Sequence, residues 1–196
     1  MDRGLARAPR LAVVGIDIPV GLHESAARQA DLAVAARLGP RRSSLFRTPV
    51  RPALEQPTYA AANACQRALT GEGVSAQAYA LRGKVLEVDR WRAQTPCRLV
   101  EVHPETSFAV LAGAPARHAK RTWAGLMERL ALLASAGLVP PADLALDPGS
   151  PSPGPDDVVD ALAAAWTAAR VARGRAVSLP DPPEVLSDGT PCAIWA

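Results

Sequence analysis

The chain has 196 residues, a formal net charge of +3 at pH 7 and a hydrophobic content of 48%. This length suits one well-buried domain, and we expect a single domain over residues 1–196. Three widely spaced cysteines without a CxxC pair exclude a disulfide framework and a cysteine zinc site, and no apolar run approaches the roughly 18 residues of a membrane span. The composition therefore predicts a cytoplasmic protein with reduced thiols and no membrane partner.

Residues 1–10 form a basic segment that we expect to be a disordered lead-in. The next segment, LAVVGIDIPVGL at residues 11–22, predicts a buried strand of a parallel sheet that ends near Ile18, because Pro19 cannot donate to a ladder. Asp17 then lies at the carboxyl end of the strand, where open α/β sheets place their sites. Either Asp17 has a functional role there, or it caps a turn or pairs with an arginine.

A helix is expected from Ser25 to about Leu38, followed by the segment RRSSLFRTPVRP at residues 41–52. Arginine forks and hydroxyl groups suit phosphate oxygens, so this segment is either a phosphate-contacting loop or a solvated connector. Its candidate nucleic-acid contacts are Arg41, Arg42, Ser43 and Arg47.

Two further helices are predicted, one that begins after Thr58 and ends at Gly71 and one that begins after Ser75 and bends at Gly83. A second strand, RLVEVHP at residues 98–104, is also short, apolar and followed by polar groups. Alternation places Glu101 and His103 on one of its faces. A short helix then begins at Glu105.

Lys120 lies in a loop before a predicted helix at residues 124–136, and residues 147–156 form a Pro/Gly/Ser-rich flexible loop. The last clear helix carries Asp160 in its first turns, just before small residues that allow close approach to a sheet. A short strand is expected near residues 175–179. Strands that alternate with helices indicate an α/β fold with a largely parallel sheet.

The acids form a possible constellation, because two end predicted strands and one opens a late helix. If these elements pack together, the carboxylates of Asp17, Glu101 and Asp160 converge and favour Mg²⁺ or Mn²⁺. Two such ions about 4 Å apart can drive phosphodiester hydrolysis. His103 and Glu105 are candidates for a further ligand or a general base, although His103 can equally be a partly buried histidine bonded to a backbone carbonyl.

The chain resembles a bacterial and archaeal domain-of-unknown-function family of predicted nucleases with an RNase H-like fold. The segments that carry the resemblance keep the family's order: GIDIPVGL (15–22), RRSSLFRTPVR (41–51), TGEGVSAQAYAL (70–81), EVHPETSF (101–108) and DALAAAWTAAR (160–170). The resemblance implies a three-layer RNase H-like fold with catalytic acids at Asp17, Glu101, Glu105 and Asp160, and with His103 beside them. The family pattern begins with a strand and hairpin, which we expect to be missing here because only ten residues precede Leu11.

Three functions follow from these patterns. The first is a metal-dependent nuclease in which Asp17, Glu101 and Asp160 hold Mg²⁺ or Mn²⁺ and basic residues contact nucleic acid. The second is a catalytically inactive RNase H-like scaffold that binds nucleic acid or a protein partner through the same surface. The third, hydrolysis of a small phosphorylated metabolite, lacks support from any GxxxxGK[ST] or GxGxxG loop.

Overall fold

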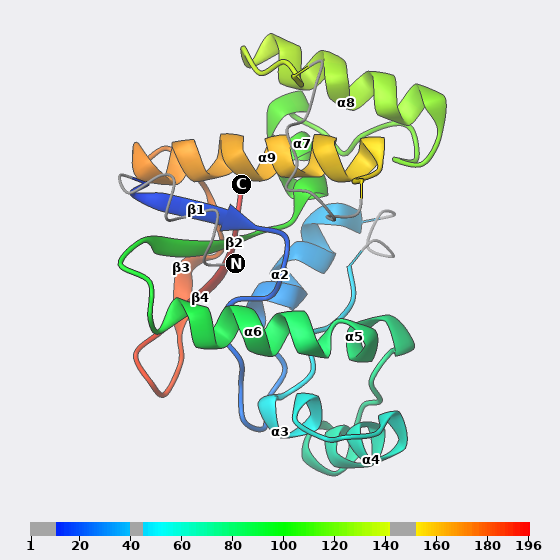
Figure 1. Ribbon diagram of the computed structural model, residues 1–196, viewed down its shortest axis with the longest axis vertical. Coiled ribbons are helices and arrows are strands. Elements are labelled where there is room, and N and C mark those ends of the chain that lie inside the picture. The colour runs from blue at the N-terminus through cyan, green and yellow to red at the C-terminus, as the bar shows by residue number, and fades with distance from the viewer. Residues whose placement is uncertain (1–10, 40–44, 142–151) are drawn as a thin grey trace.

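The computed structural model describes residues 11–39, 45–141 and 152–196, which form eight helices and a four-stranded sheet (Figure 1). The strand order is β1-β2-β4-β3. Strands β1 (Val13–Ile16), β2 (Arg98–Val102) and β4 (Pro191–Trp195) are parallel to one another, whereas β3 (Ser178–Val185) is antiparallel to β4. The predicted α/β class with a largely parallel sheet is confirmed.

Helix α9 (Pro155–Ala172) covers one face of β1 and β2 (Figure 1). Val100 and Val102 of β2 pack there against Ala164 and Val171 of the helix. The contact is close, because a Cβ atom added to Gly15 would lie 2.5 Å from the Ala164 carbonyl oxygen. Gly15 and the alanines of α9 therefore set how near this helix lies to the sheet.

The opposite face of the sheet is covered by helix α2 (Gln29–Leu38). Ala30, Val34 and Leu38 pack against Cys192 and Ile194 of β4 in one buried cluster. Together the two helical layers bury the sheet on both faces, as expected for parallel strands.

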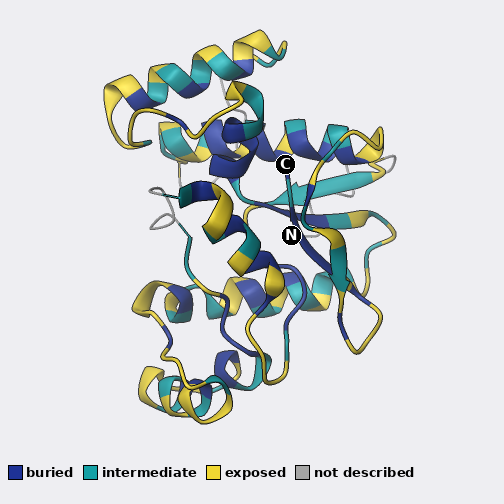
Figure 2. Cartoon of the chain, turned by 180° about the vertical axis from the view of Figure 1, so that it is seen from behind, coloured by how far each residue is buried: buried dark blue, intermediate teal, exposed yellow. Residues whose placement is uncertain are grey.

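The remaining helices form two groups on either side of the sheet in the view of Figure 1, and Figure 2 shows both buried and exposed residues along them. On one side are α3 (Arg51–Leu54), α4 (Tyr59–Thr70), α5 (Ala76–Ala80) and α6 (Arg82–Arg92). On the other side, α7 (Pro104–Ala112) and α8 (Trp123–Ser135) pack with α9 around Phe108, Leu133 and Val159. None of the helices in the described ranges combines the length and apolarity needed to cross a membrane.

Several predicted boundaries are confirmed by their caps. The Thr58 hydroxyl accepts a hydrogen bond from the Ala61 amide, the Ser75 hydroxyl accepts one from the Ala78 amide, and α4 ends at Gly71 with φ +77°. Side-chain caps of this kind satisfy amides that have no partner within the helix.

Other predicted boundaries are wrong. Helix α2 begins at Gln29 instead of Ser25, because Arg28 has an extended backbone and its side chain enters the interior. The break between α5 and α6 falls at Leu81, which packs into an apolar cluster, and Gly83 continues within α6.

The carboxyl-terminal hairpin is the largest correction to the predicted elements. A short strand was expected near residues 175–179, but β3 extends to Val185 and the final residues form β4 between β2 and β3. The predicted lead-in at residues 1–10 and residues 147–151 of the predicted flexible loop lie outside the described ranges.

Candidate functional site

A cavity of about 590 Å³ opens at the carboxyl ends of β1 and β2. The sheet contributes Asp17 and Glu101 to its walls, and the start of α9 contributes Asp160. Segments between and after these elements complete the lining, among others with Lys84, His103, Glu105, Lys120 and Arg121. The predicted acids therefore border one cavity.

Asp17 and Asp160 approach each other because β1 and α9 run in opposite directions. Asp17 lies two residues beyond Gly15 along the strand direction, an advance of about 6.6 Å. Ala164 is the residue of α9 that contacts Gly15, and Asp160 lies one turn before it in the helix. Because the helix is antiparallel to the strand, Asp160 is displaced by about 6 Å from this contact toward the same end of the sheet as Asp17. The close contact at Gly15 therefore brings the two carboxylates to the same end of the sheet.

The charges of Asp17 and Asp160 interact directly with each other and with one lysine. Asp17 is exposed to the open cavity, yet partial withdrawal from water, followed by repulsion from Asp160, raises the pKa of its carboxyl group to about 6, and Lys120 opposes this rise. Burial likewise raises the pKa of Asp160, again against the effect of Lys120. The Lys120 Nζ atom donates to Asp160 Oδ2 at 2.8 Å, whereas the buried Asp160 Oδ1 accepts no hydrogen bond from the described residues.

Glu101 lies on the other face of the sheet. It pairs in parallel register with Ile16, whereas Gly15 pairs with Val100 on the face that α9 covers. The Glu101 carboxylate accepts from Arg28 Nη2 at 2.5 Å and from the Val20 amide at 2.8 Å through the same oxygen, Oε2. Burial raises the pKa of Glu101 to about 7, against the opposing effects of Arg28 and the Val20 amide. The two donors on one oxygen, at 2.5 and 2.8 Å, identify a buried ion pair.

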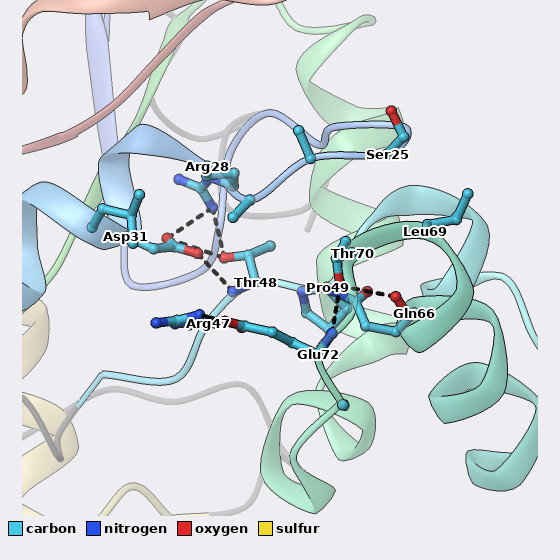
Figure 3. A pocket seen from close by; sticks show the side chains of 14 residues that line it. Ser25, Arg28, Asp31, Arg47, Thr48, Pro49, Gln66, Leu69, Thr70 and Glu72 are labelled. Carbon is cyan, nitrogen blue, oxygen red and sulfur yellow. Dashed lines mark hydrogen bonds and ion pairs between the residues drawn. The ribbon is translucent and has the colours of Figure 1, made fainter.

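Arg28 also pairs with a second buried carboxylate, that of Asp31, at 3.8 Å, and Figure 3 shows this pair. Arg28 Nη1 donates to the Thr48 hydroxyl at 2.8 Å, and the Thr48 amide donates to Asp31 Oδ2 at 2.7 Å. Both acids and the arginine are buried, so this network satisfies charges that would otherwise be costly to desolvate.

Glu105 is similarly occupied by an arginine. Arg129 Nε donates to Glu105 Oε1 at 2.9 Å, and Arg129 Nη2 donates to Glu105 Oε2 at 2.7 Å. Both side chains are buried, and the bidentate geometry joins α7 to α8. His103 is half-buried as the N-cap residue of α7, and its carbonyl oxygen accepts from the Thr106 amide at 2.9 Å.

The predicted nucleic-acid contacts fall in different places. Lys120 lies in the cavity with Asp17 and Asp160. Arg47 lies at a separate cavity of about 250 Å³ and forms an exposed ion pair with Glu72 (Figure 3). Arg41, Arg42 and Ser43 lie outside the described residues.

Sequence reasoning missed the arginines that neutralise the acids. Arg28 and Asp31 are three positions apart, and both flank the apolar stripe of Ala30 and Val34 on α2. An arginine and an aspartate three positions apart, next to the apolar stripe of a helix, can therefore indicate a buried ion pair. Arg129 has a comparable signal, since it stands among leucines in α8.

The residues that could hold a metal are Asp17 and Asp160. Glu101 and Glu105 each have an arginine partner, so Asp17, Asp160 and Lys120 remain as a group with one excess negative charge. In the described ranges, no three His, Cys, Asp or Glu side chains are grouped so that they could hold one ion. Mg²⁺ commonly uses one or two carboxylates together with water and substrate phosphate, and the unbonded Asp160 Oδ1 is a suitable acceptor.

Comparisons with known proteins identify a family. Residues 2–185 match the family described as "Protein of unknown function (DUF429)". No curated protein and no solved structure matches the chain. The match extends over most of the 196 residues, and the chain therefore belongs to the DUF429 family.

Proposed function

We propose that the protein hydrolyses phosphodiester bonds of nucleic acid with Mg²⁺ or Mn²⁺ held by Asp17 and Asp160. The observation that carries this proposal is the pair of carboxylates that lines one cavity at the end of the sheet, with Lys120 hydrogen-bonded to Asp160. Glu101, expected to be the third ligand, is paired with Arg28, and we therefore leave it out of the proposed metal site. The proposal therefore places two protein carboxylates, rather than three, on the metal.

The residues that line the cavity have different roles in the proposed reaction. Asp17 and Asp160 supply the hard oxygen atoms, and a divalent ion bound there would lower the pKa of a water and neutralise phosphate charge. Lys120 holds Asp160 Oδ2, so an ion would use the unbonded Oδ1, and the remaining hydrogens of the Lys120 ammonium group would be free to contact a phosphate oxygen. Lys84 and Arg121 line the same cavity and orient the neighbouring phosphates.

We also propose that the fold is of the RNase H-like type. Three features support this: a largely parallel sheet buried between helical layers, an acid directly after β1, and an acid on a late helix that covers the sheet. The antiparallel β3–β4 hairpin places a strand beside β2 that the sequence did not predict. A solved structure of the chain, compared with RNase H-like folds, tests this proposal.

The experiment that tests the proposed function is cleavage of a panel of single-stranded and duplex DNA and RNA by the purified chain. Reactions contain Mn²⁺, Mg²⁺ or EDTA, and compare the wild type with Asp17→Asn, Asp160→Asn and the surface control Glu55→Gln. Metal-dependent cleavage that is lost in the first two variants and kept in the control supports the proposal. Cleavage that persists in EDTA or in both aspartate variants contradicts it.

One observation favours the second function, a scaffold that binds without cleavage. Lys120 already pairs with Asp160, and Arg28 already pairs with Glu101. Among these side chains and Asp17, only one negative charge is left without a basic partner. A folded wild type that binds oligonucleotides in a salt-sensitive manner but shows no turnover with either metal would establish this alternative.

A further inference from the structure

Trp123 is the most exposed large apolar side chain of the described residues, with 75% of its surface accessible. It is the first residue of α8, directly after Lys120, Arg121 and the cap residue Thr122. The Thr122 hydroxyl accepts from the Gly125 amide at 3.0 Å and donates to the Ala119 carbonyl at 2.8 Å, which fixes the backbone that carries the indole. The indole is thus carried on a well-ordered helix start and is accessible to a partner.

The indole borders an open cavity of about 510 Å³. Its other walls are Leu126 of α8 and Pro155 and Asp156 at the start of α9, together with Lys120 and Arg121. The same two basic residues also line the larger cavity that contains Asp17 and Asp160. The two cavities are therefore adjacent, and their shared border is positively charged.

Arg121 is exposed, and within the described part of the chain it forms no ion pair. The Arg121 guanidinium can therefore bind a phosphate group, and the neighbouring Trp123 indole can stack on a nucleobase. Alternating cationic and aromatic groups along a groove are the features that bind single-stranded nucleic acid, since every base offers a face for stacking. In a duplex, the base faces are already stacked on each other and are withheld from the indole.

We propose that Trp123 is a stacking platform for an unpaired nucleobase, and that Lys120 and Arg121 hold the phosphate between this base and the cavity of Asp17 and Asp160. The substrate class is accordingly single-stranded nucleic acid. This inference rests on the proposed function for the cleavage step, but base stacking itself requires neither metal nor turnover.

The test is equilibrium binding in EDTA, measured by fluorescence anisotropy with a labelled single-stranded DNA, the RNA of the same sequence and the corresponding duplex. Trp123→Ala is expected to weaken single-strand binding about 5-fold to 150-fold, and Trp123→Phe, which keeps a smaller ring, is expected to weaken it less. Met127→Ala is the matched control, because Met127 is exposed on the same helix but does not line this cavity. Circular dichroism and thermal unfolding verify that each variant is folded.

The outcomes separate the two proposals. Loss of single-strand binding in Trp123→Ala, with duplex binding and the Met127→Ala control unchanged, supports the stacking platform whether or not cleavage occurs. Unchanged binding in Trp123→Ala, equal losses for single strand and duplex, or no binding of either nucleic acid by the wild type overturns it. Metal-dependent cleavage by the wild type together with unchanged binding in Trp123→Ala would leave the proposed function standing and remove only the stacking platform.

Discussion

Asp17 and Glu101 follow or end neighbouring parallel strands, yet their carboxylates lie on opposite faces of the sheet. The register pairs Ile16 with Glu101, so Asp17, one residue further, belongs to the face that α9 covers. Asp17 consequently interacts with Asp160 and Lys120, whereas Glu101 interacts with Arg28. This separation leaves Glu101 in a buried ion pair and Asp17 in the cavity, where we propose that it binds metal.

The structural role of Glu101 predicts a large loss of stability in Glu101→Gln. The variant leaves the buried Arg28 guanidinium without its carboxylate, which costs about 3–5 kcal/mol in the free energy of unfolding. Urea denaturation measures this loss. A Glu101→Gln protein as stable as the wild type would contradict the structural assignment.

The raised pKa of Asp17 predicts how its contribution to stability depends on pH in metal-free protein. The group titrates at about 6 in the folded chain and near 3.8 when unfolded. Between these values the folded state holds a proton that the unfolded state has lost, so the contribution to stability decreases as the pH rises from about 4 to about 6. Asp17→Asn removes this decrease.

At pH 7, Asp17→Asn should therefore be more stable than the wild type, by up to about 1 kcal/mol because water at the cavity mouth screens the charge. Denaturation curves of both proteins in EDTA at pH 4, 5, 6 and 7 provide the measurement. Parallel pH profiles for the two proteins would show that Asp17 titrates normally.

The close approach of α9 to β1 predicts that Gly15→Ala is destabilising. The new methyl group would lie 2.5 Å from the Ala164 carbonyl oxygen, and overpacking of this kind costs about 1–3 kcal/mol. Gly83→Ala is the matched control, since an added Cβ at Gly83 meets no atom within 4 Å and the residue lies inside α6. The control should gain about 0.5–1 kcal/mol. Thermal unfolding of both variants tests the contrast, which would fail if Gly15→Ala were as stable as Gly83→Ala.

The position of Lys120 predicts that Lys120→Met raises the pKa of Asp17 above about 6, because Lys120 is the positive charge that opposes the effects of burial and of Asp160. Carbon-13 NMR titration of the aspartate carboxyl groups, with Asp17→Asn for assignment, measures the shift. Lys84→Met, which removes an exposed lysine from the same cavity, should leave the titration nearly unchanged. Equal shifts in the two variants would indicate a general effect of net charge.

The sequence predicted the position of Asp17 and Asp160 because both follow from local patterns. An apolar run closed by Pro19 locates a strand end, and small residues after Asp160 indicate a helix that approaches a sheet closely. The two patterns place the carboxylates at the same end of the fold, and the structure brings them together.

The sequence could not predict that Glu101 is separated from them, because the face to which a residue points depends on strand register. A shift of one residue between β1 and β2 would exchange the faces of Val100 and Glu101. The β3–β4 hairpin could not be predicted either, because Pro180, Pro182 and Pro183 are unfavourable in a strand and all lie in β3. Both features are determined by tertiary pairing rather than by local pattern.

We propose that Asp17 and Asp160 hold one divalent ion, and a Mn²⁺ titration followed by electron paramagnetic resonance tests this binding without a substrate. The wild type and Glu55→Gln should bind Mn²⁺ at one site, whereas Asp17→Asn and Asp160→Asn should each lose this binding while remaining folded. Binding of equal strength in the wild type and both aspartate variants, or no binding by the wild type, would contradict the account.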